Sequence, residues 1–409
     1  MINRTILSEI ELCTKVKPVT LITGARQVGK STLATTFMKK GFSYTSLDDS
    51  RERILAQEDP ILFLQLHPWP LIIDEVQKAP ELFEAIEEIV NKEKLKRVDN
   101  YGMYILTGSQ TYKLMKNVTE SMAGRVAIVH MSGLSRSEIL GIEDDELDYD
   151  LLKINEKAKL NPLKPLELYE NIIKGSYPEL YSNSLLKSDR FYSDYVESYI
   201  EKDVSEIINI KYKNDFRRFM ELIASLTGQE LIYNNIAKII GVDLKTIKSW
   251  ISVLEAGDII YLLEPYSEIS ITKRVVKRPK LYFTDTGLAA YLAKMTNAEA
   301  LRASAFGESF VETYIINELR KKFLNHGKKP NFYYYRDNNM NEIDLVIIDE
   351  GIMHRNECKS GITFNNSHVK GFKQLDNTVY KKGMNFIICS TDSIYKINDD
   401  TYAIPIASL

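Results

Sequence analysis

A nine-residue stretch near the N-terminus, GARQVGKST (residues 24–32), limits the folds open to this chain more than any other feature. A short apolar and β-branched run, Val19 to Thr23, precedes it, and apolar residues at helical spacing follow it. A glycine-containing turn between a buried strand and a helix is the setting of a phosphate-binding P-loop. The sequence therefore predicts an α/β fold with a parallel sheet, whose first turn binds the phosphates of a nucleotide.

The residue types in this turn suit a triphosphate. Gly24 and Gly29 let backbone N–H groups curl around the β-phosphate, and the start of the following helix adds partial positive charge. Lys30 can reach the β- and γ-phosphates, and the hydroxyl of Ser31 can ligate Mg²⁺. ATP and Mg²⁺ are therefore the expected ligands. The residues expected to contact them in this turn are Gly24, Ala25, Arg26, Gln27, Val28, Gly29, Lys30, Ser31 and Thr32.

Two further apolar runs end in polar residues that suit hydrolysis. The run PLIIDE ends in Asp74, which would hold the Mg²⁺ shell, and Glu75, which would orient or deprotonate a water molecule. In YILTGS, Ser109, or with less support Thr107, could hydrogen-bond the γ-phosphate or its water. Ligands of parallel sheets lie at the carboxyl ends of strands, where these motifs fall. The alternative interpretation is a strand that simply ends in solvated acids.

Stretches spread over nearly the whole chain resemble a family of bacterial and archaeal AAA-type (AAA+) P-loop ATPases that carry a C-terminal domain of unknown function. The matching stretches are GARQVGKST, SLDD (46–49), LIIDEVQKAP, ILTGSQ, MAGRV (122–126), GSYPEL (175–180) and RPKLYFTDTGLAAYL (278–292). The resemblance implies that Arg125 meets a γ-phosphate, in its own or a neighbouring subunit. A surface arginine after a helix-ending glycine is the alternative. Members of the family often form rings, so the resemblance also suggests a homo-oligomer.

Composition excludes several classes of protein. No apolar run approaches the roughly 20 residues that span a bilayer, and Glu9 and Glu11 interrupt the N-terminal apolar residues, unlike a signal peptide. Three scattered cysteines argue against a disulfide framework or a zinc site. A cytoplasmic protein without a membrane partner is therefore expected. Because the net charge is only −3, contact with nucleic acid must come from local basic patches.

The length of 409 residues predicts more than one domain. An acidic stretch, EDDELDYD, is expected to lead out of the first sheet. We predict four parts. They are an AAA-type P-loop ATPase core at 1–145, a helical lid or connector at 146–210, a winged-helix domain at 211–300, and a small α/β, restriction-endonuclease-like domain at 301–409.

A helix-turn-helix pattern supports the third part. Ala237 lies four residues before Gly241, and this pair would allow two helices to approach closely across a sharp turn. A strand and a basic hairpin would complete a winged helix. Duplex or branched DNA is then the expected partner, although winged helices also serve as protein-docking modules. The residues expected at DNA are Lys245, Thr246, Lys248 and Ser249 on the second helix and Lys273, Arg274, Lys277 and Arg278 in the hairpin.

Charged residues in the last part resemble those of the PD-(D/E)xK nuclease fold. Asp344 precedes an apolar run, Glu357 and Lys359 follow on the next strand, and an earlier helix carries Glu308 and Glu312. Asp344 and Glu357 would bind Mg²⁺, Lys359 would position water or stabilise the phosphate, and a helix glutamate would complete the shell. The proline that names the motif is absent. Two alternatives stay open: charged residues at ordinary strand ends, and a nuclease-like fold that binds DNA without cutting it.

These patterns together predict a Mg²⁺-dependent ATPase that acts on DNA through its winged-helix and nuclease-like domains. A rival hypothesis is a nucleotide-controlled switch whose C-terminal domains bind a protein partner, as in toxin–antitoxin or defence signalling. A nuclease licensed by ATP is a third possibility.

Overall fold

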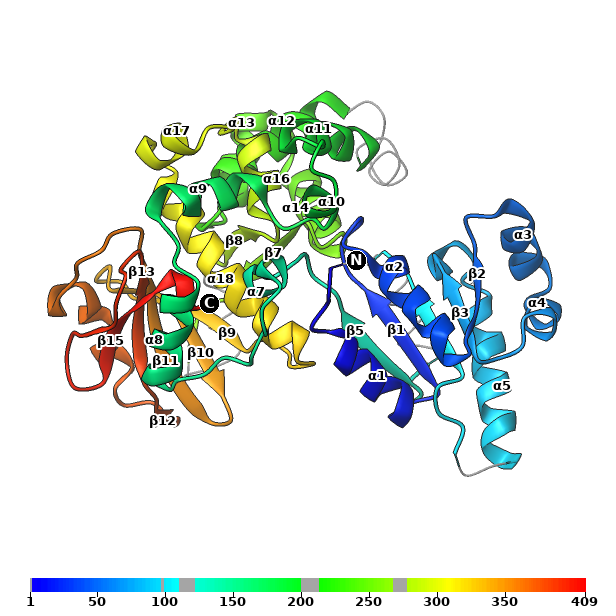
Figure 1. Cartoon of the computed structure of the whole chain (residues 1–409). Coiled ribbons are helices and arrows are strands. Elements are labelled where there is room, and N and C mark those ends of the chain that lie inside the picture. Colours follow the sequence, from blue (N-terminus) through cyan, green and yellow to red (C-terminus); the bar gives the residue numbers. More distant parts are fainter. Residues whose placement is uncertain (1, 97–98, 110–121, 200–212, 268–277) are drawn as a thin grey trace.

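Three units of the chain can be followed in Figure 1. A P-loop unit (blue to cyan) adjoins a helical middle unit (green to yellow), which lies beside a C-terminal sheet unit (orange to red). The computed structural model describes residues 2–96, 99–109, 122–199, 213–267 and 278–409. Within these ranges, none of the helices combines the length and the apolar character that a bilayer crossing requires.

The P-loop unit is built on a five-stranded parallel sheet in the order β2-β3-β4-β1-β5. The strands are β1 (Val19–Thr23), β2 (Ser43–Ser46), β3 (Leu71–Asp74), β4 (Tyr104–Thr107) and β5 (Val126–His130). The central strands β1, β3 and β4 are buried along their whole length, as expected when helices cover both faces. The predicted parallel sheet is therefore confirmed, and the P-loop, Asp74 and Thr107 lie at one edge of it.

The helices of this unit are α1 (Leu7–Val16), α2 (Lys30–Ala34), α3 (Ser50–Glu58), α4 (Pro60–Leu66) and α5 (Leu82–Lys96), with 3-10 helices η1 (Thr35–Lys40) and η2 (Val76–Lys78). The helix after the P-loop is shorter than expected, because α2 gives way to η1. At that point the hydroxyls of Thr35 and Thr36 donate to the carbonyls of Thr32 and Leu33, at 2.9 and 2.6 Å. Such local bonds compete with the regular helix ladder.

The middle unit packs helices around a small antiparallel sheet in the order β6-β8-β7. Gly241, with a φ of 85°, ends α13, and Asp243 caps α14 by accepting a 2.9 Å bond from the backbone N–H of Thr246. Trp250 anchors α14 in the core against Phe216 and Phe219 of α12, with ring centroids 5.2 and 5.1 Å away. The elements are α9 (Pro165–Lys174), α10 (Glu179–Ser182), α11 (Ser188–Tyr199), α12 (Lys213–Ser225), β6 (Gln229–Glu230), α13 (Tyr233–Ile240), α14 (Leu244–Ala256), β7 (Ile260–Leu263), β8 (Lys280–Phe283), α16 (Thr286–Leu292) and α17 (Ala298–Ala303).

The C-terminal unit is a mixed sheet in the order β14-β15-β13-β11-β10-β9, with β12 paired to β11. Its strands are β9 (Phe332–Arg336), β10 (Glu342–Asp349), β11 (Ile352–Cys358), β12 (Lys381–Lys382), β13 (Asn385–Cys389), β14 (Tyr395–Lys396) and β15 (Thr401–Pro405). Between β11 and β12 the chain forms the 3-10 helix η5 (Asn366–Leu375), and η6 (Ile406–Ser408) follows β15. The helix α8 (Leu151–Leu160) packs on β15 and η6 and so lies with this unit.

The long helix α18 (Gly307–Asn325) is the centre of the molecule in Figure 1. It is buried on nearly all sides, and its buried charged residues are paired. Lys321 donates to the carbonyl of Leu134 and to Glu318, both at 2.8 Å. The short helix α7 (Arg136–Leu140) leads out of the P-loop unit, and the backbone N–H of Arg136 donates to Glu318 at 2.7 Å. Buried polar bonds of this kind fix the P-loop unit to α18.

Candidate nucleotide-binding site

The P-loop turns sharply between β1 and α2. Positive φ angles occur at Gly24, Gln27 and Gly29, at 144°, 61° and 96°. A Cβ at Gly24 would lie 2.1 Å from the carbonyl oxygen of Met131, so only glycine lets the chain leave β1 past the end of β5. The local sequence thus produces the curled backbone that the motif predicts.

Lys30 lies inside this curl. Its ammonium donates to the carbonyls of Ala25 at 2.6 Å and Gly24 at 3.1 Å, and the residue is only 6% exposed. Burial lowers the pKa of Lys30 to about 8, against the opposing charges of Glu75, Asp258 and Asp74. A buried ammonium inside a P-loop is suited to bind phosphate oxygens.

Asp74 collects three hydroxyls at the end of β3. Ser31 donates to its Oδ1 at 2.8 Å, Tyr44 donates to its Oδ2 at 3.0 Å, and Thr107 also donates to Oδ1. Burial and the charge of Asp74 raise the pKa of Tyr44 to about 12, so the phenol stays a donor. Thr107 therefore holds Asp74, while Ser109 lies two residues beyond the strand, half-buried, next to the undescribed segment 110–121.

Glu75 follows directly in the left-handed region, with a φ of 58°. Its backbone N–H donates to the hydroxyl of Thr107 at 3.4 Å, and the side-chain amide of Gln77 donates to its carboxylate. Glu75 is half-buried in this turn, while Asp74 is buried. Two consecutive acids thus receive different surroundings, one held by hydroxyls and one by an amide.

The donor set fits a magnesium-bound nucleotide. A serine hydroxyl and a carboxylate oxygen 2.8 Å apart stand beside a buried ammonium, and Mg²⁺ is commonly held by one or two carboxylates together with substrate phosphates. Across the described ranges, no three or more His, Cys, Asp and Glu side chains gather as an all-protein metal site. A metal at Ser31 and Asp74 would therefore depend on the phosphates for further ligands.

Arg125 corrects an expectation. It stands just before β5, and its carbonyl accepts from the backbone N–H of Val19 at the start of β1. Its guanidinium binds Asn91 at 2.8 Å and Glu87 at 3.1 Å on α5. Because β1 and β5 are parallel, this position is the edge of the sheet opposite the P-loop. The expectation that Arg125 meets phosphate in its own subunit is wrong, and contact with a neighbouring subunit stays a prediction.

The residues expected at DNA lie in different surroundings. Lys245, Lys248 and Ser249 are exposed on α14. Thr246 is half-buried, and its hydroxyl donates to the capping carboxylate of Asp243 at 2.8 Å. Arg278 is exposed, 3.9 Å from Glu230. The other three predicted contacts, Lys273, Arg274 and Lys277, lie outside the described residues.

The residues of the predicted nuclease centre lie together on β10 and β11. Lys359 binds both acids, at 2.7 Å from Asp344 and 2.8 Å from Glu357. Burial alone would raise the pKa of Asp344, but Lys359 and Lys280 outweigh it and hold this pKa below its ordinary value. Burial and the charge of Asp344 raise the pKa of Glu357 well above its ordinary value. One carboxyl with a lowered pKa thus lies beside one with a raised pKa.

The helix glutamates differ from the expectation. Glu308 is exposed and binds the backbone N–H of Ser360 at 3.1 Å and its hydroxyl, so the structure does not place it in a shell with Asp344. Glu312 is the buried one, bound by Lys280 at 3.0 Å and by the hydroxyl of Tyr282 at 2.5 Å. Burial raises the pKa of Glu312 to about 7. The role of Glu308 as a metal ligand therefore stays a prediction.

Three stretches of the chain match known family models. Residues 16–140 match a family described as an AAA domain. The N-terminal unit is therefore similar to AAA-type P-loop domains. Beyond this stretch, residues 166–299 match one domain of unknown function (DUF8612) and residues 307–409 match another (DUF4143). The first match agrees with the P-loop geometry, and the other two carry no described activity.

Two mycobacterial proteins are similar to most of the chain in sequence. Uncharacterized protein Rv2008c of Mycobacterium tuberculosis and uncharacterized protein Mb2031c of Mycobacterium bovis are each 25% identical over 333 residues, which covers 81% of this chain and 67% of the relative. Among solved structures, the Walker-type ATPase PABY2304 of Pyrococcus abyssi has a TM-score of 0.40 at 15% identity and covers 71% of this chain and 96% of its own. A point variant of RuvB from Thermotoga maritima has a TM-score of 0.32 at 15% identity, with 63% and 88% covered. Scores this low do not establish a shared fold.

Sequence reasoning missed two residues at this site. Tyr44 lies in β2, and Asp258 reaches the P-loop from the middle unit. Tyr44 pairs with Ile72 of β3, two residues before Asp74. The order of the strands in the sheet is therefore the signal that could identify Tyr44. No local signal announces the second.

Proposed function

We propose that this protein is a Mg²⁺-dependent ATPase that hydrolyses ATP at the P-loop. The observation that carries the proposal is the 2.8 Å bond between Ser31 and Asp74, made beside the buried ammonium of Lys30. Lys30 would bind the β- and γ-phosphates, and Ser31 and Asp74 would hold Mg²⁺, which supplies charge neutralisation to the phosphates when bound. Glu75 would orient or deprotonate the attacking water.

Glu75→Gln tests this assignment. The variant should bind ATP as the wild type does, while its turnover falls by about 100-fold or more, the usual effect of losing a general base. ATP affinity by calorimetry and phosphate release by a coupled assay measure the two quantities. Glu84→Gln, an exposed substitution on α5, serves as the matched control and should change neither. Unchanged phosphate release in Glu75→Gln would refute the role of this acid.

We propose that DNA is the molecule on which this ATPase acts. The middle unit runs α12, β6, α13, α14, β7 and β8 with an antiparallel sheet, which is the order of elements in a winged helix. The second helix of the helix-turn-helix pair, α14, carries exposed Lys245 and Lys248 on the side away from Trp250. These features support DNA binding through phosphates and a groove.

DNA binding can be measured with labelled duplexes, forks and four-way junctions. Affinity should fall as salt rises, because binding cations to phosphates releases counterions. Lys245→Ala with Lys248→Ala should weaken binding and make the salt dependence shallower. If none of these DNA structures binds at low ionic strength, the DNA part of the proposal fails.

A second candidate is a nucleotide-controlled switch that binds a protein partner. It is favoured by the carboxylates of the C-terminal unit, which are bound by Lys280 and Lys359. The discriminating measurement is whether DNA or a protein lysate stimulates ATP turnover. Nicking of labelled DNA with Mg²⁺ or Mn²⁺, absent in Asp344→Ala, would instead favour a nuclease.

A further inference from the structure

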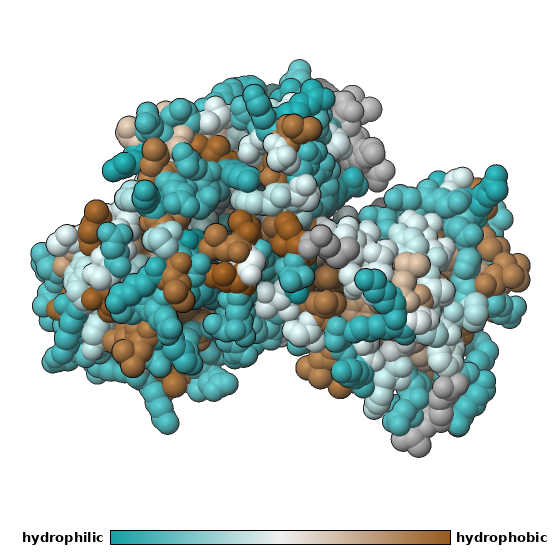
Figure 2. Space-filling model, viewed as in Figure 1, coloured by the Kyte–Doolittle hydropathy of each residue, from teal (hydrophilic) through white to brown (hydrophobic). Residues whose placement is uncertain are grey.

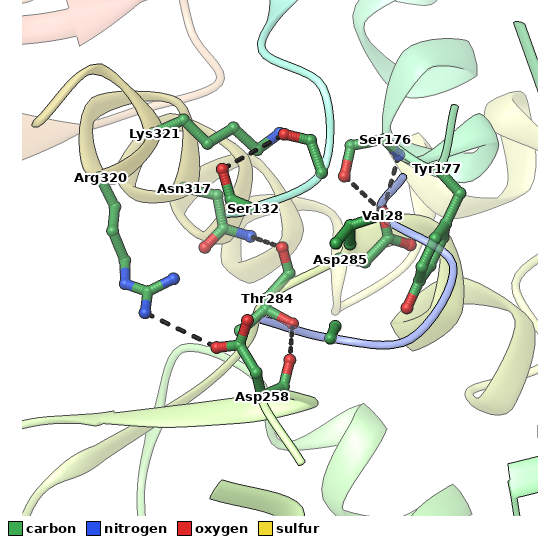
Figure 3. Close-up of a pocket in the computed structure, with 12 residues that line it drawn as sticks. Val28, Ser132, Ser176, Tyr177, Asp258, Thr284, Asp285, Asn317, Arg320 and Lys321 are labelled. Atoms are coloured by element: carbon green, nitrogen blue, oxygen red, sulfur yellow. Dashed lines mark hydrogen bonds and ion pairs between the residues drawn. The ribbon is translucent and has the colours of Figure 1, made fainter. Parts of the chain in front are cut away.

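One carboxylate of the middle unit lies against the P-loop. Asp258 stands between α14 and β7 in a left-handed conformation, with a φ of 55°, and is only 5% exposed. Its own carbonyl accepts a 2.6 Å bond from the hydroxyl of Thr284 at the end of β8, which Figure 3 shows. A non-glycine residue in this conformation costs about 1 kcal/mol, so the packing must hold it there.

The P-loop unit, the middle unit and α18 meet at this carboxylate. The backbone N–H of Ala25 in the P-loop bonds to it, His130 Nε2 of β5 lies 3.0 Å from Oδ2, and Arg320 of α18 lies 3.7 Å from Oδ1. Figure 3 shows Arg320 pointing toward Asp258 from α18. Burial alone would raise the pKa of Asp258, but His130, Arg320 and Ala25 outweigh it and hold this pKa below its ordinary value. The carboxylate of Asp258 is therefore charged and lies against the P-loop.

Two of its partners are suited to another anion. Although His130 Nε2 is close to Asp258, it has no hydrogen-bond partner of good geometry among the described residues. Arg320 also lies over the ring of Tyr261, with 4.7 Å between the guanidinium and the ring centroid, so it is held in place without Asp258. Asp258 is also one of the negative charges that act on the ammonium of Lys30.

Little room remains beside the seated carboxylate. The cavity that Ala25, Val28, Asp258 and Arg320 line holds about 20 Å³, which is room for about one water molecule. A phosphate group could not enter there while Asp258 stays in place.

We propose that Asp258 and the triphosphate compete for the same cations. The proposal rests on nucleotide binding at the P-loop. Phosphates at the loop would repel the carboxylate, and Arg320 and His130, no longer neutralised by it, would become phosphate-binding residues. Arg320 would then contact the phosphates within the same subunit. Arg125 cannot do so, because it lies at the opposite edge of the sheet. Because such coupling is reciprocal, nucleotide binding loosens the turn between α14 and β7, and whatever holds that turn weakens nucleotide binding.

The test compares three variants in the full chain by titration with a fluorescent ATP analogue and its ADP counterpart. Asp258→Asn should tighten ATP binding about tenfold, within the usual range for coupled sites. Arg320→Gln should weaken the binding of ATP more than that of ADP. Asp243→Asn at the other end of α14 keeps a good helix cap and should bind as the wild type does.

Hydrogen exchange on the wild type provides a measurement that needs no variant. Saturating ATP should speed exchange of the amides around Asp258, between α14 and β7. Slower or unchanged exchange there, or an Asp258→Asn affinity equal to that of the wild type, overturns the competition while leaving the ATPase proposal intact. If the wild type and all variants bind no ATP analogue, the proposed function falls and this inference falls with it.

Discussion

The hydroxyl groups around Asp74 restrict where each of its oxygens points. Ser31 and Thr107 donate to Oδ1 and Tyr44 to Oδ2, so the carboxylate is oriented before any metal binds. A ligand whose orientation is fixed in advance needs less reordering on binding, and partners of this kind tune metal affinity. Tyr44 is therefore a positioning residue for the proposed Mg²⁺ site.

Tyr44→Phe removes that bond and little else. A hydrogen bond to a charged group is worth about 1.5–3 kcal/mol when buried, and Tyr44 is 36% exposed, so a loss of about 1 kcal/mol is expected. The Mg²⁺ concentration for half-maximal ATP turnover should rise about fivefold, with kcat at saturating Mg²⁺ nearly unchanged. Tyr101→Phe, an exposed tyrosine of the same unit, should leave the Mg²⁺ titration where it is. If Tyr44→Phe gave the same Mg²⁺ titration as the wild type, Tyr44 would not be a positioning residue.

The sequence can predict those site residues that lie within one continuous motif or at the end of a recognisable strand. Gly24, Lys30 and Ser31 lie in one continuous motif, and Asp74 ends a recognisable strand, so the pattern alone places them. Residues that arrive through tertiary packing, such as Tyr44 and Asp258, have no such pattern. The misplacement of Arg125 in its own subunit has the same origin, because its distance from the P-loop depends on the register between β1 and β5.

At the scale of elements, α8 shows how composition can assign a helix to the wrong neighbours. The sequence groups it with a connector, since it follows an acidic stretch and resembles any amphipathic helix. It packs instead on β15 and η6, more than 240 residues further along the chain. Ile154 and Ala158 form its buried side, while Leu152 and Leu160 remain exposed.

On the face shown in Figure 2, apolar residues form small groups among hydrophilic ones.

Lys157 makes the docking of α8 dependent on pH. Burial, followed by the charge of Lys322, lowers the pKa of Lys157 from 10.5 to about 8. A lysine whose folded pKa lies below its unfolded pKa destabilises the fold while it is charged. The full cost applies below about pH 8 and disappears as the pH rises toward 10.5. Stability should therefore increase between these two values.

Lys157→Met should remove this cost. At pH 7 the variant should gain about 1 kcal/mol, a value reduced because the residue as a whole is partly exposed. Its advantage over the wild type should shrink between pH 8 and pH 10.5, as the wild-type lysine loses its proton. Calorimetric melting at pH 7 and pH 9.5 measures both effects. Lys153→Met, exposed on the same helix and paired with Asp148, should bring no gain, and an equal gain there would contradict the argument.

The whole molecule is held together by buried charges at the places where its units meet. Arg136 donates to the carbonyl of Ala407 at 3.0 Å and so joins the end of the P-loop unit to the last residues of the chain. Lys280 joins the middle unit to α18 and β10 through Glu312 at 3.0 Å and Glu342 at 2.6 Å. Breaking such a pair leaves an uncompensated charge in the interior, which costs more than the pair contributes.

Lys280→Met tests how strongly this junction couples the middle and C-terminal units. The variant keeps most of the length of the side chain but leaves Glu312 buried without its cation, and a loss of about 3 kcal/mol is expected. Adding Glu312→Gln removes the orphaned charge, so the double variant should be more stable than Lys280→Met alone. Lys294→Met breaks an exposed pair with Glu221 and should cost less than about 1 kcal/mol. Melting curves of the wild type, Lys280→Met, Glu312→Gln, the double variant and Lys294→Met measure the coupling. Additive losses from Lys280→Met and Glu312→Gln would show that the two residues act independently.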